Sequence, residues 1–476
     1  MHASLLDAAR PLLAGLLVAA LLAGCGSEAA PARQPNVLLI VLDTLRTDHM
    51  SGYGYALPTT PNLDALATQG VQFMDCTAQA AWTGPSMISL MTGLPIFNSL
   101  MNLPADFPVL AESFQRAGYR TGAVVANSVL GEEHGFNRGF DQFSARQVGT
   151  EAWTAVKVNR HAVEFLERDD DRPFLLWLHY LDTHNPYTPP ALPWTRTPEQ
   201  VFTPWERAAI EATILKAPEG ERARLYGQIG ELAREVDRYD AELHWLDARL
   251  GELLAELGRL GVREETLIVV AADHGETLFR RPEHPDHFAK IKEWKDKHGM
   301  PMELADYMMR EHHSTNFQEL LRTPLIVAGP GIAGGRRIDV MVSNLNLRPT
   351  LLGLAGLPVP EGPGRDLSAA LRSGGKVTPD AWVTSAAHQA VSARLPDGRK
   401  FVLPAEGIMR RLGVKPAVYS LRDDPDELRP LPLDERAQAI LDELAEQWQN
   451  DAFTAWVGTD SKPEDIEILK ELGYVR

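Results

Sequence analysis

The chain has 476 residues, of which 44% are hydrophobic and 23% charged, a composition typical of a globular protein. Its 64 acidic residues outnumber 47 basic ones and give a formal net charge of −17, which excludes nucleic acid and anionic membrane surfaces as preferred partners. The length is sufficient for one large domain and a smaller one.

An apolar run stands at the start of the chain. The stretch PLLAGLLVAALLAGC, residues 11–25, is short for a bilayer span and ends in small residues and a cysteine. Its last four residues, LAGC, resemble the lipobox of bacterial lipoproteins. The resemblance implies a signal peptide over 1–24, a lipid anchor on Cys25 and a place in the cell envelope, on the periplasmic or extracellular face. A secretory signal or a single anchor helix is the alternative.

Cysteine occurs only at positions 25 and 76. If Cys25 carries a lipid, Cys76 has no partner for an intrachain disulfide. We therefore expect the hydrophobic core to stabilise the fold, even in an oxidising compartment. Residues 25–35 are small and polar and are expected to form a tether.

Continuous apolar runs recur over residues 36–375 and predict buried strands. The first of them, NVLLIVLD at 36–43, stops at a carboxylate. Patterns with helical spacing separate the runs, so we predict an α/β fold with a doubly wound, mostly parallel sheet flanked by helices. The other strands are expected at 121–127, 173–182, 266–275 and 323–331, and the clearest helices at 61–70 and 241–261.

Two polar segments interrupt this alternation. Residues 188–235 are rich in proline, then charged and helical, and are expected to form a surface insertion. Residues 277–311 follow a predicted strand end directly, so they are interpreted either as a solvated loop or as a lid over the site. Over 376–476, short strands with turns and a closing amphipathic helix predict a small C-terminal α+β subdomain.

Side chains that bind metals follow two of the predicted strands. Asp43 ends the first strand, and Asp273 and His274 end the strand at 266–275. In open α/β sheets functional groups gather at the carboxyl ends of strands, and two carboxylates with an imidazole suit one divalent cation. Separately, Asp43 has the alternative of pairing with Arg46 or capping a helix, and His274 of lying in a turn. Their joint placement favours a metal site.

The stretch TGPSMISLMTG, residues 83–93, predicts a helix with Thr83 at its N-cap and Pro85 just inside. A helix N-terminus favours negative charge, and a hydroxyl beside a divalent cation loses its proton more readily. Thr83 is therefore either only a cap or a nucleophile that also contacts the metal.

Several motifs resemble, in order, those of the sulfatases of the alkaline phosphatase superfamily. They are PNVLLIVLDTLRTDHMSGYGY, TTPNLDALATQGVQF, TGPSMISLMTGLP, AGYRTGAVVAN, HYLDTHNPYTPP, VVAADHGE and LLRTPLIVAGPG, and VYSLRDDPDE resembles the C-terminal element of that family. The resemblance implies a hydrolase of ester bonds. It assigns Asp43, Asp273 and His274 to metal-ligand positions and Thr83 to the nucleophile position.

The same resemblance implies three further residues of the site. His184 falls on a histidine that contacts the anion of the substrate. Either His312 or His313 falls near the residue that serves the leaving group, and the sequence leaves the choice between them open.

The sequence departs from the sulfatase pattern at several positions. Sulfatases carry Cys or Ser as the nucleophile, which is oxidised to formylglycine, and Thr83 cannot become that aldehyde. The arginine and the second aspartate of the pattern are replaced by Met87 and Thr44. The lysine and histidine that clamp sulfate in many members would fall near Ala126 and Ser128.

Other members of the superfamily match these departures. A threonine nucleophile with Asp and His ligands resembles the phosphodiesterases and phosphoethanolamine transferases, in which the threonine takes the phosphoryl group covalently. His274, where calcium-dependent sulfatases commonly carry Asn, favours zinc or manganese over calcium. Asp182 and His184, with His312 or His313, are candidates for a second metal site.

Three functional hypotheses follow. The favoured one is a metal-dependent, sulfatase-like hydrolase of the cell envelope that cleaves a phosphate, phosphonate or sulfate ester of a small molecule, glycan or lipid. The second is a transferase that moves a phospho-headgroup to an envelope glycan or lipid. The third is a binding lipoprotein without catalysis, whose sulfatase site has decayed. The retained metal ligands argue against decay, whereas Met87, Ala126 and Ser128 argue for it.

Overall fold

The computed structural model describes residues 34–96, 102–147, 149–310, 312 and 315–450. The predicted signal peptide, the lipid anchor on Cys25 and most of the tether lie outside the described residues, as does His313. Within the described ranges, no helix has the length and hydropathy needed to cross a membrane.

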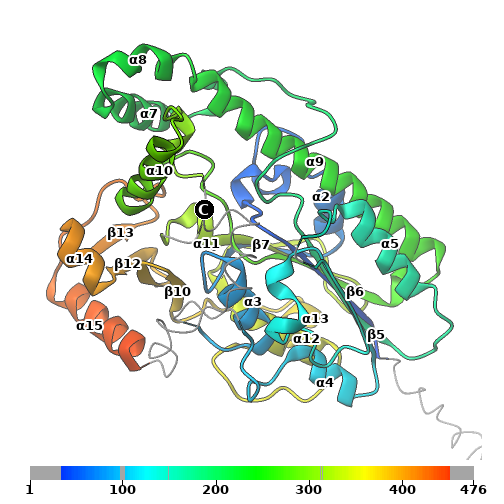
Figure 1. The fold of residues 1–476 in the computed structure, drawn as a ribbon. Coiled ribbons are helices and arrows are strands. Elements are labelled where there is room, and N and C mark those ends of the chain that lie inside the picture. Colours follow the sequence, from blue (N-terminus) through cyan, green and yellow to red (C-terminus); the bar gives the residue numbers. More distant parts are fainter. Residues whose placement is uncertain (1–33, 97–101, 148, 311, 313–314, 451–476) are drawn as a thin grey trace, which may run out of the picture. The chain divides into compact units, whose positions relative to one another are not determined.

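A nine-stranded sheet carries the residues of the site (Figure 1). Its order is β4-β3-β5-β1-β6-β7-β2-β8, with β9 paired to β2. All neighbouring strands are parallel except β7, which runs antiparallel to β6 and β2, so the predicted mostly parallel sheet is confirmed. The strands are β1 (Asn36–Leu42), β2 (Val71–Thr77), β3 (Arg120–Val125), β4 (Gln142–Ala145), β5 (Phe174–Tyr180), β6 (Thr266–Ala272), β7 (Arg322–Ala328), β8 (Arg336–Ile338) and β9 (Val342–Ser343).

Strand β1 is buried along its whole length because helices cover both faces of the sheet. Val37, Leu39 and Val41 belong to one core, with α3, α4 and α12, and the alternate residues of β1 belong to the other, with α2, α5 and α9. Figure 1 shows these two layers. The helices are α2 (Pro61–Gln69), α3 (Thr83–Thr92), α4 (Leu110–Arg116), α5 (Ala155–Leu166), α9 (Ile229–Arg259), α12 (Leu347–Leu354) and α13 (Ser368–Ser373).

The strand order places β1 where the chain changes direction along the sheet. From β1 the chain continues to β2 on the β6 side, whereas β3 and β5 lie on the opposite side. In open α/β sheets, such a switch leaves a crevice at the carboxyl ends of the strands, where ligands bind. This crevice is the place at which the polar residues after β1 and β6 must meet.

The two segments expected to be insertions pack against each other. One apolar cluster joins Phe202 and Ile210 of the first segment to Leu278, Phe279 and Met308 of the second, and Figure 1 shows α7, α8 and α10 together. A fully solvated loop over 277–311 is therefore wrong, because burial of apolar side chains orders that segment; its role as a lid stays a prediction. The helices are α6 (Pro198–Val201), α7 (Pro204–Lys216), α8 (Glu219–Tyr226) and α10 (Pro285–Lys297).

Helix α9 begins at Ile229, earlier than the helix predicted over 241–261, and the expected insertion at 188–235 ends inside it. Leu232, Ala233 and Val236 are buried on its first turns. The apolar spacing thus continues upstream of the stretch from which the helix was predicted.

A second, antiparallel sheet follows in the order β10-β11-β12-β13. Helix α15 packs Ala437, Leu441 and Leu444 against it, which confirms the small α+β unit expected in this part of the chain. Its boundary at 376 stays a prediction. The elements are α11 (Gln318–Leu321), β10 (Val383–Ala387), β11 (Ala390–Arg394), β12 (Arg399–Pro404), α14 (Glu406–Leu412), β13 (Ala417–Ser420) and α15 (Glu435–Asn450).

Candidate active and metal site

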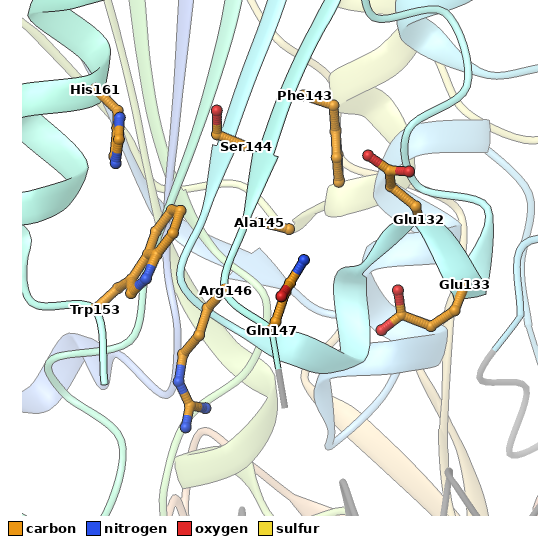
Figure 2. Close-up of a pocket in the computed structure, with 9 residues that line it drawn as sticks. All are labelled: Glu132, Glu133, Phe143, Ser144, Ala145, Arg146, Gln147, Trp153 and His161. Atoms are coloured by element: carbon orange, nitrogen blue, oxygen red, sulfur yellow. The ribbon is translucent and has the colours of Figure 1, made fainter. Parts of the chain in front are cut away.

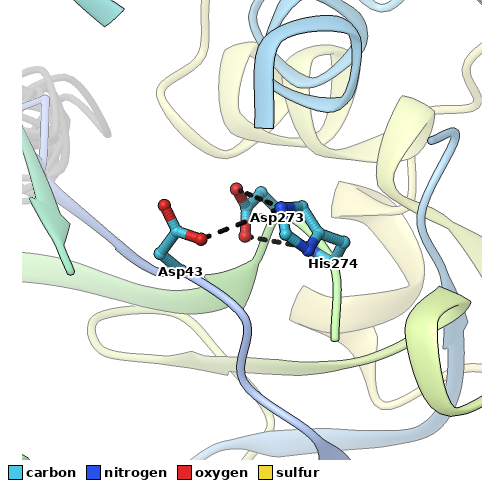
Figure 3. Close-up of side chains that lie close together, drawn as sticks. All are labelled: Asp43, Asp273 and His274. Atoms are coloured by element: carbon cyan, nitrogen blue, oxygen red, sulfur yellow. Dashed lines mark hydrogen bonds and ion pairs between the residues drawn. The ribbon is translucent and has the colours of Figure 1, made fainter. Parts of the chain in front are cut away.

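The structure brings Asp43, Asp273 and His274 together at the carboxyl edge of the sheet (Figure 3). Strands β1 and β6 are parallel neighbours with Leu42 opposite Ala272, so the residues that follow them share one edge. One ligand atom from each of the three side chains lies within 4.8 Å of the other two, and all three residues are buried. The sequence argument from strand ends therefore located this cluster correctly.

The donor set fits a divalent cation. Asp43 Oδ1 and Asp273 Oδ2 are buried and have no hydrogen-bond partner in the part of the chain that the structure describes. Burial, joined at Asp43 by the Asp273 carboxylate, raises the pKa of each residue to about 7. Two carboxylates in this position are unfavourable as a pair of anions, and a cation between them removes the penalty.

The imidazole of His274 is oriented for the same cation. Its Nδ1 donates to the Gly275 carbonyl at 2.9 Å, so Nε2 carries the lone pair. Nε2 lies 3.7 Å from Asp43 Oδ1 and 3.4 Å from Asp273 Oδ2. Burial lowers the pKa of His274 and favours the neutral ring that binds metals.

Neighbouring residues hold the two carboxylates in place. Asn127 Nδ2 donates to Asp43 Oδ2 at 2.8 Å, and the backbone N–H groups of Thr44 and His274 donate to Asp273 Oδ1 at 3.3 and 2.8 Å. Thr44 adopts a φ of 56°, which β-branched residues rarely do. Its side chain lies 2.7 Å from the Asp43 carbonyl oxygen. Thr44 thus positions the ligands, although the sulfatase pattern has a carboxylate there.

Thr83 lies at the N-terminus of α3, but it is the first helical residue and not the cap. Trp82 occupies the N-cap position with extended backbone, φ −162° and ψ 160°. The predicted cap was therefore wrong, because the chain enters the helix one residue earlier than the capping pattern indicated. Thr83 is buried, and its Oγ1 lies 3.2 Å from His274 Nε2. The hydroxyl thus faces the nitrogen that also faces both carboxylates.

His312 and His184 lie on the other side of His274. The His312 ring is centred 4.3 Å from the His274 ring and 5.2 Å from the His184 ring. His312 Nδ1 lies 3.2 Å from Glu276 Oε2, so its Nε2 is the nitrogen turned away from that carboxyl. Burial, followed by His274, His184 and His388, holds the pKa of His312 well below its usual range.

Three residues near the ligands were not found from the sequence. Asn127 and Glu276 follow strand ends, as the predicted ligands do, and this signal was sufficient to find them. His179 stands inside an apolar strand run that gives no such signal. It is buried, with neither ring nitrogen hydrogen-bonded within the described residues, and its Nε2 is 3.8 Å from Asp43 Oδ2.

The structure does not support the second metal site. The only grouping of metal-type ligands among the described residues is Asp43, Asp273 and His274. Asp182 Oδ1 instead accepts a hydrogen bond from the Ala155 N–H at 2.9 Å, at the start of α5. That carboxylate is used by a helix N-terminus, which the spacing of Asp182 and His184 did not show.

The remaining departures from the sulfatase pattern are buried. Met87 and Ala126 belong to the two cores of the sheet. The Ser128 hydroxyl is also buried and has no hydrogen-bond partner within the described ranges. No cationic side chain therefore stands at these positions to bind an anion.

A separate cavity of about 410 Å³ lies at the end of β4 (Figure 2). Trp153 forms one wall, and Glu132, Glu133 and Phe143 form the other. Its lining residues include none of those described above. Strand β4 is at the edge of the sheet and is separated from β1 by β3 and β5, so the cavity is distinct from the metal-ligand cluster.

The chain matches the family model described as Sulfatase over residues 35–357. It belongs to the sulfatase family. This family lies within the alkaline phosphatase superfamily, and the protein is a hydrolase that acts on ester bonds. The match covers both metal-ligand strands and α3, so the cluster at the carboxyl edge lies inside the family domain.

Individual relatives are distant. The N-acetylglucosamine-6-O-sulfatase of Bacteroides thetaiotaomicron is 26% identical over 451 residues, which cover 77% of this chain and 76% of that protein. A protein solved in complex with its substrate D-glucosamine-2-N,6-O-disulfate aligns with a TM-score of 0.64 at 20% identity, over 88% of this chain and 99% of that one. The phosphonate monoester hydrolase of Agrobacterium radiobacter aligns with a TM-score of 0.62 at 20% identity, over 87% and 95%. The two structural likenesses establish the fold.

Proposed function

We propose that this sulfatase-family protein cleaves a phosphate, phosphonate or sulfate ester with Thr83 as its nucleophile. The observation that carries the proposal is the 3.2 Å separation between Thr83 Oγ1 and His274 Nε2. Asp43, Asp273 and His274 would hold one divalent cation, and the imidazole favours zinc or manganese over calcium. When bound, this cation supplies positive charge that stabilises the Thr83 alkoxide and the ester anion.

The protein residues divide the reaction between them. Thr83 Oγ1 forms a bond to the phosphorus or sulfur while the bond to the leaving oxygen breaks. Thr83 gives up one proton, and His312 Nε2 donates one to the leaving oxygen, so the protons balance. The imidazole of His184 faces the anion. Water then cleaves the bond to Thr83 and regenerates the hydroxyl.

Phosphorus esters are the better substrates in this proposal. Threonine has no second hydroxyl on the attacking carbon, which the aldehyde hydrate of sulfatases has. Positions 126 and 128, where many sulfatases clamp sulfate, carry Ala and Ser here. We therefore expect aryl phosphates, phosphonates and phosphodiesters to react faster than aryl sulfates.

The proposed setting is the cell envelope, with the chain anchored by a lipid on Cys25. The LAGC sequence supports this assignment. Cys25→Ser should release the protein from the membrane fraction without changing its specific activity. A membrane-bound Cys25→Ser protein, or a mature chain that starts at another residue, would contradict the anchor.

The function is tested with chelator-treated protein that is reloaded with zinc, manganese or calcium. Each form is assayed on 4-nitrophenyl phosphate, bis(4-nitrophenyl) phosphate, 4-nitrophenyl phenylphosphonate and 4-nitrophenyl sulfate. Thr83→Ala should lower kcat by on the order of 10³-fold or more, and Thr83→Ser should retain part of it. Brisk turnover of the sulfate alone, or an unaffected Thr83→Ala variant, would sink the proposal. A strict need for an acceptor alcohol would indicate the transferase instead.

A further inference from the structure

The β10–β11 hairpin of the second sheet is bonded to the segment that leads into α3. The Ala81 N–H donates to the Ala386 carbonyl at 3.0 Å, and the Ala386 N–H donates to the Gln79 carbonyl at 2.8 Å. The Ser385 hydroxyl donates to the Ala78 carbonyl at 2.6 Å. The hairpin is thus held directly beside the chain that carries Thr83.

The same hairpin is bonded to the segment that follows His312. Asn316 Nδ2 donates to the Ser385 carbonyl at 3.4 Å and to the Ala390 carbonyl at 3.0 Å. Asn316 is 4% exposed, so these bonds are protected from water. The hairpin therefore spans the two chain segments that supply the proposed nucleophile and the proposed acid.

His388 stands in the turn of this hairpin, between β10 and β11. Its ring meets the Trp82 ring edge to face, with centroids 4.8 Å apart at 76°. Trp82 is 4% exposed and directly precedes Thr83, whereas the His388 side chain is exposed. His388 also contributes to the lowered pKa of His312. These observations place the imidazole at the rim of the site, on the side of the residue that serves the leaving group.

The environment of His388 favours a neutral ring. Desolvation by the surrounding protein lowers the pKa of His388 to about 4, although water still reaches the side chain. This combination is expected of a residue in a recess. A neutral imidazole donates through one nitrogen and accepts through the other, as a hydroxyl partner requires.

We propose that His388 is a specificity-determining residue that hydrogen-bonds a hydroxyl of the leaving alcohol, and that the site prefers esters of polyhydroxylated alcohols over aryl esters. The inference rests on the proposed function, because it needs the ester to lie between Thr83 and His312. It adds a residue from the second sheet to a site whose other members come from the larger sheet and its loops.

The test compares two substrates that share the transferred group. Phenyl phosphate has no hydroxyl on its leaving group, and glucose 6-phosphate has several; phenyl sulfate and glucose 6-sulfate form the matching sulfate pair. His388→Ala should lower kcat/KM for the glucose ester by about tenfold or more, mainly through a higher KM, and change the phenyl ester less than about twofold. His388→Gln keeps a donor and an acceptor and should restore part of the loss.

His161→Ala is the matched control, because His161 also packs on a tryptophan, with its ring 5.2 Å from the Trp153 ring, in the separate cavity. This variant should leave both substrates unaffected. An equal loss on both esters in His388→Ala, or no loss on either, overturns the specificity role while turnover of the phenyl ester upholds the hydrolase. If the wild-type protein turns over neither ester pair, the proposed function fails and the inference fails with it.

Discussion

Replacing Asp43 by asparagine should stabilise the metal-free protein and abolish its response to metal. The pKa of Asp43 is raised from 3.8 to about 7 by burial and then by Asp273. A carboxyl with a raised pKa contributes stability that is fully present below pH 3.8 and is lost as the pH rises through about 7. At pH 8 the ionised group therefore costs up to about 4 kcal/mol, which Asp43→Asn removes.

Thermal unfolding after chelator treatment measures this effect. At pH 8, Asp43→Asn should raise Tm by several degrees, with a smaller rise at pH 5. Zinc or manganese should then raise the Tm of the wild-type protein and leave the variant unchanged, because a metal that binds only the folded state stabilises it.

Asp182→Asn is the control for this experiment. Burial raises the pKa of Asp182 to about 7 as well, and an asparagine oxygen still accepts the Ala155 N–H. It should gain stability at pH 8 yet keep the full metal response. An Asp43→Asn protein that is less stable than wild type at pH 8 without metal, or that is stabilised by metal as strongly as wild type, would refute the reasoning.

Three further changes probe the surroundings of the site. Asn127→Ala should weaken metal affinity by roughly 10–100-fold in competition with a chelating dye, because it removes a hydrogen bond that orients Asp43; unchanged affinity would contradict that role. Glu276→Gln should lower kcat by about tenfold or more with little change in KM, since it alters the proton shared with its histidine partner; an altered KM alone would contradict it. Glu319→Gln should cost about 3 kcal/mol at pH 7 in urea unfolding and little near pH 2. Burial opposes ionisation of Glu319, but Arg281 outweighs it and lowers the pKa to about 2, so this stability is present above pH 4.5 and lost as the pH falls through about 2; equal loss at both pH values would contradict it.

The sequence located the part of the site that depends on strand ends. Asp43, Asp273 and His274 each follow an apolar run, and parallel neighbours must bring such residues to one edge. The antiparallel direction of β7 could not be foreseen, because an apolar run carries no sign of its direction. Nor could the cap be placed correctly, since Thr83 and Trp82 differ by one position and the capping pattern does not fix the boundary that finely.

Other parts of the site depend on contacts between distant segments. His179 lies in the middle of β5, and only the neighbouring position of β1 brings it near Asp43. His388 belongs to the second sheet and reaches Trp82 through the pairing of Ala386 with the segment before α3. Local pattern has no access to such pairings, so these residues required the structure.

Peptide mapping after rapid quenching tests most directly whether Thr83 is the nucleophile. Metal-loaded protein is mixed with excess 4-nitrophenyl phosphate, quenched in acid during turnover, digested and analysed by mass spectrometry. The account predicts a phosphoryl group on Thr83 in wild type and Thr83→Ser, and none in resting enzyme or in Thr83→Ala. Turnover that proceeds with residue 83 unmodified, and that persists in Thr83→Ala, would contradict it.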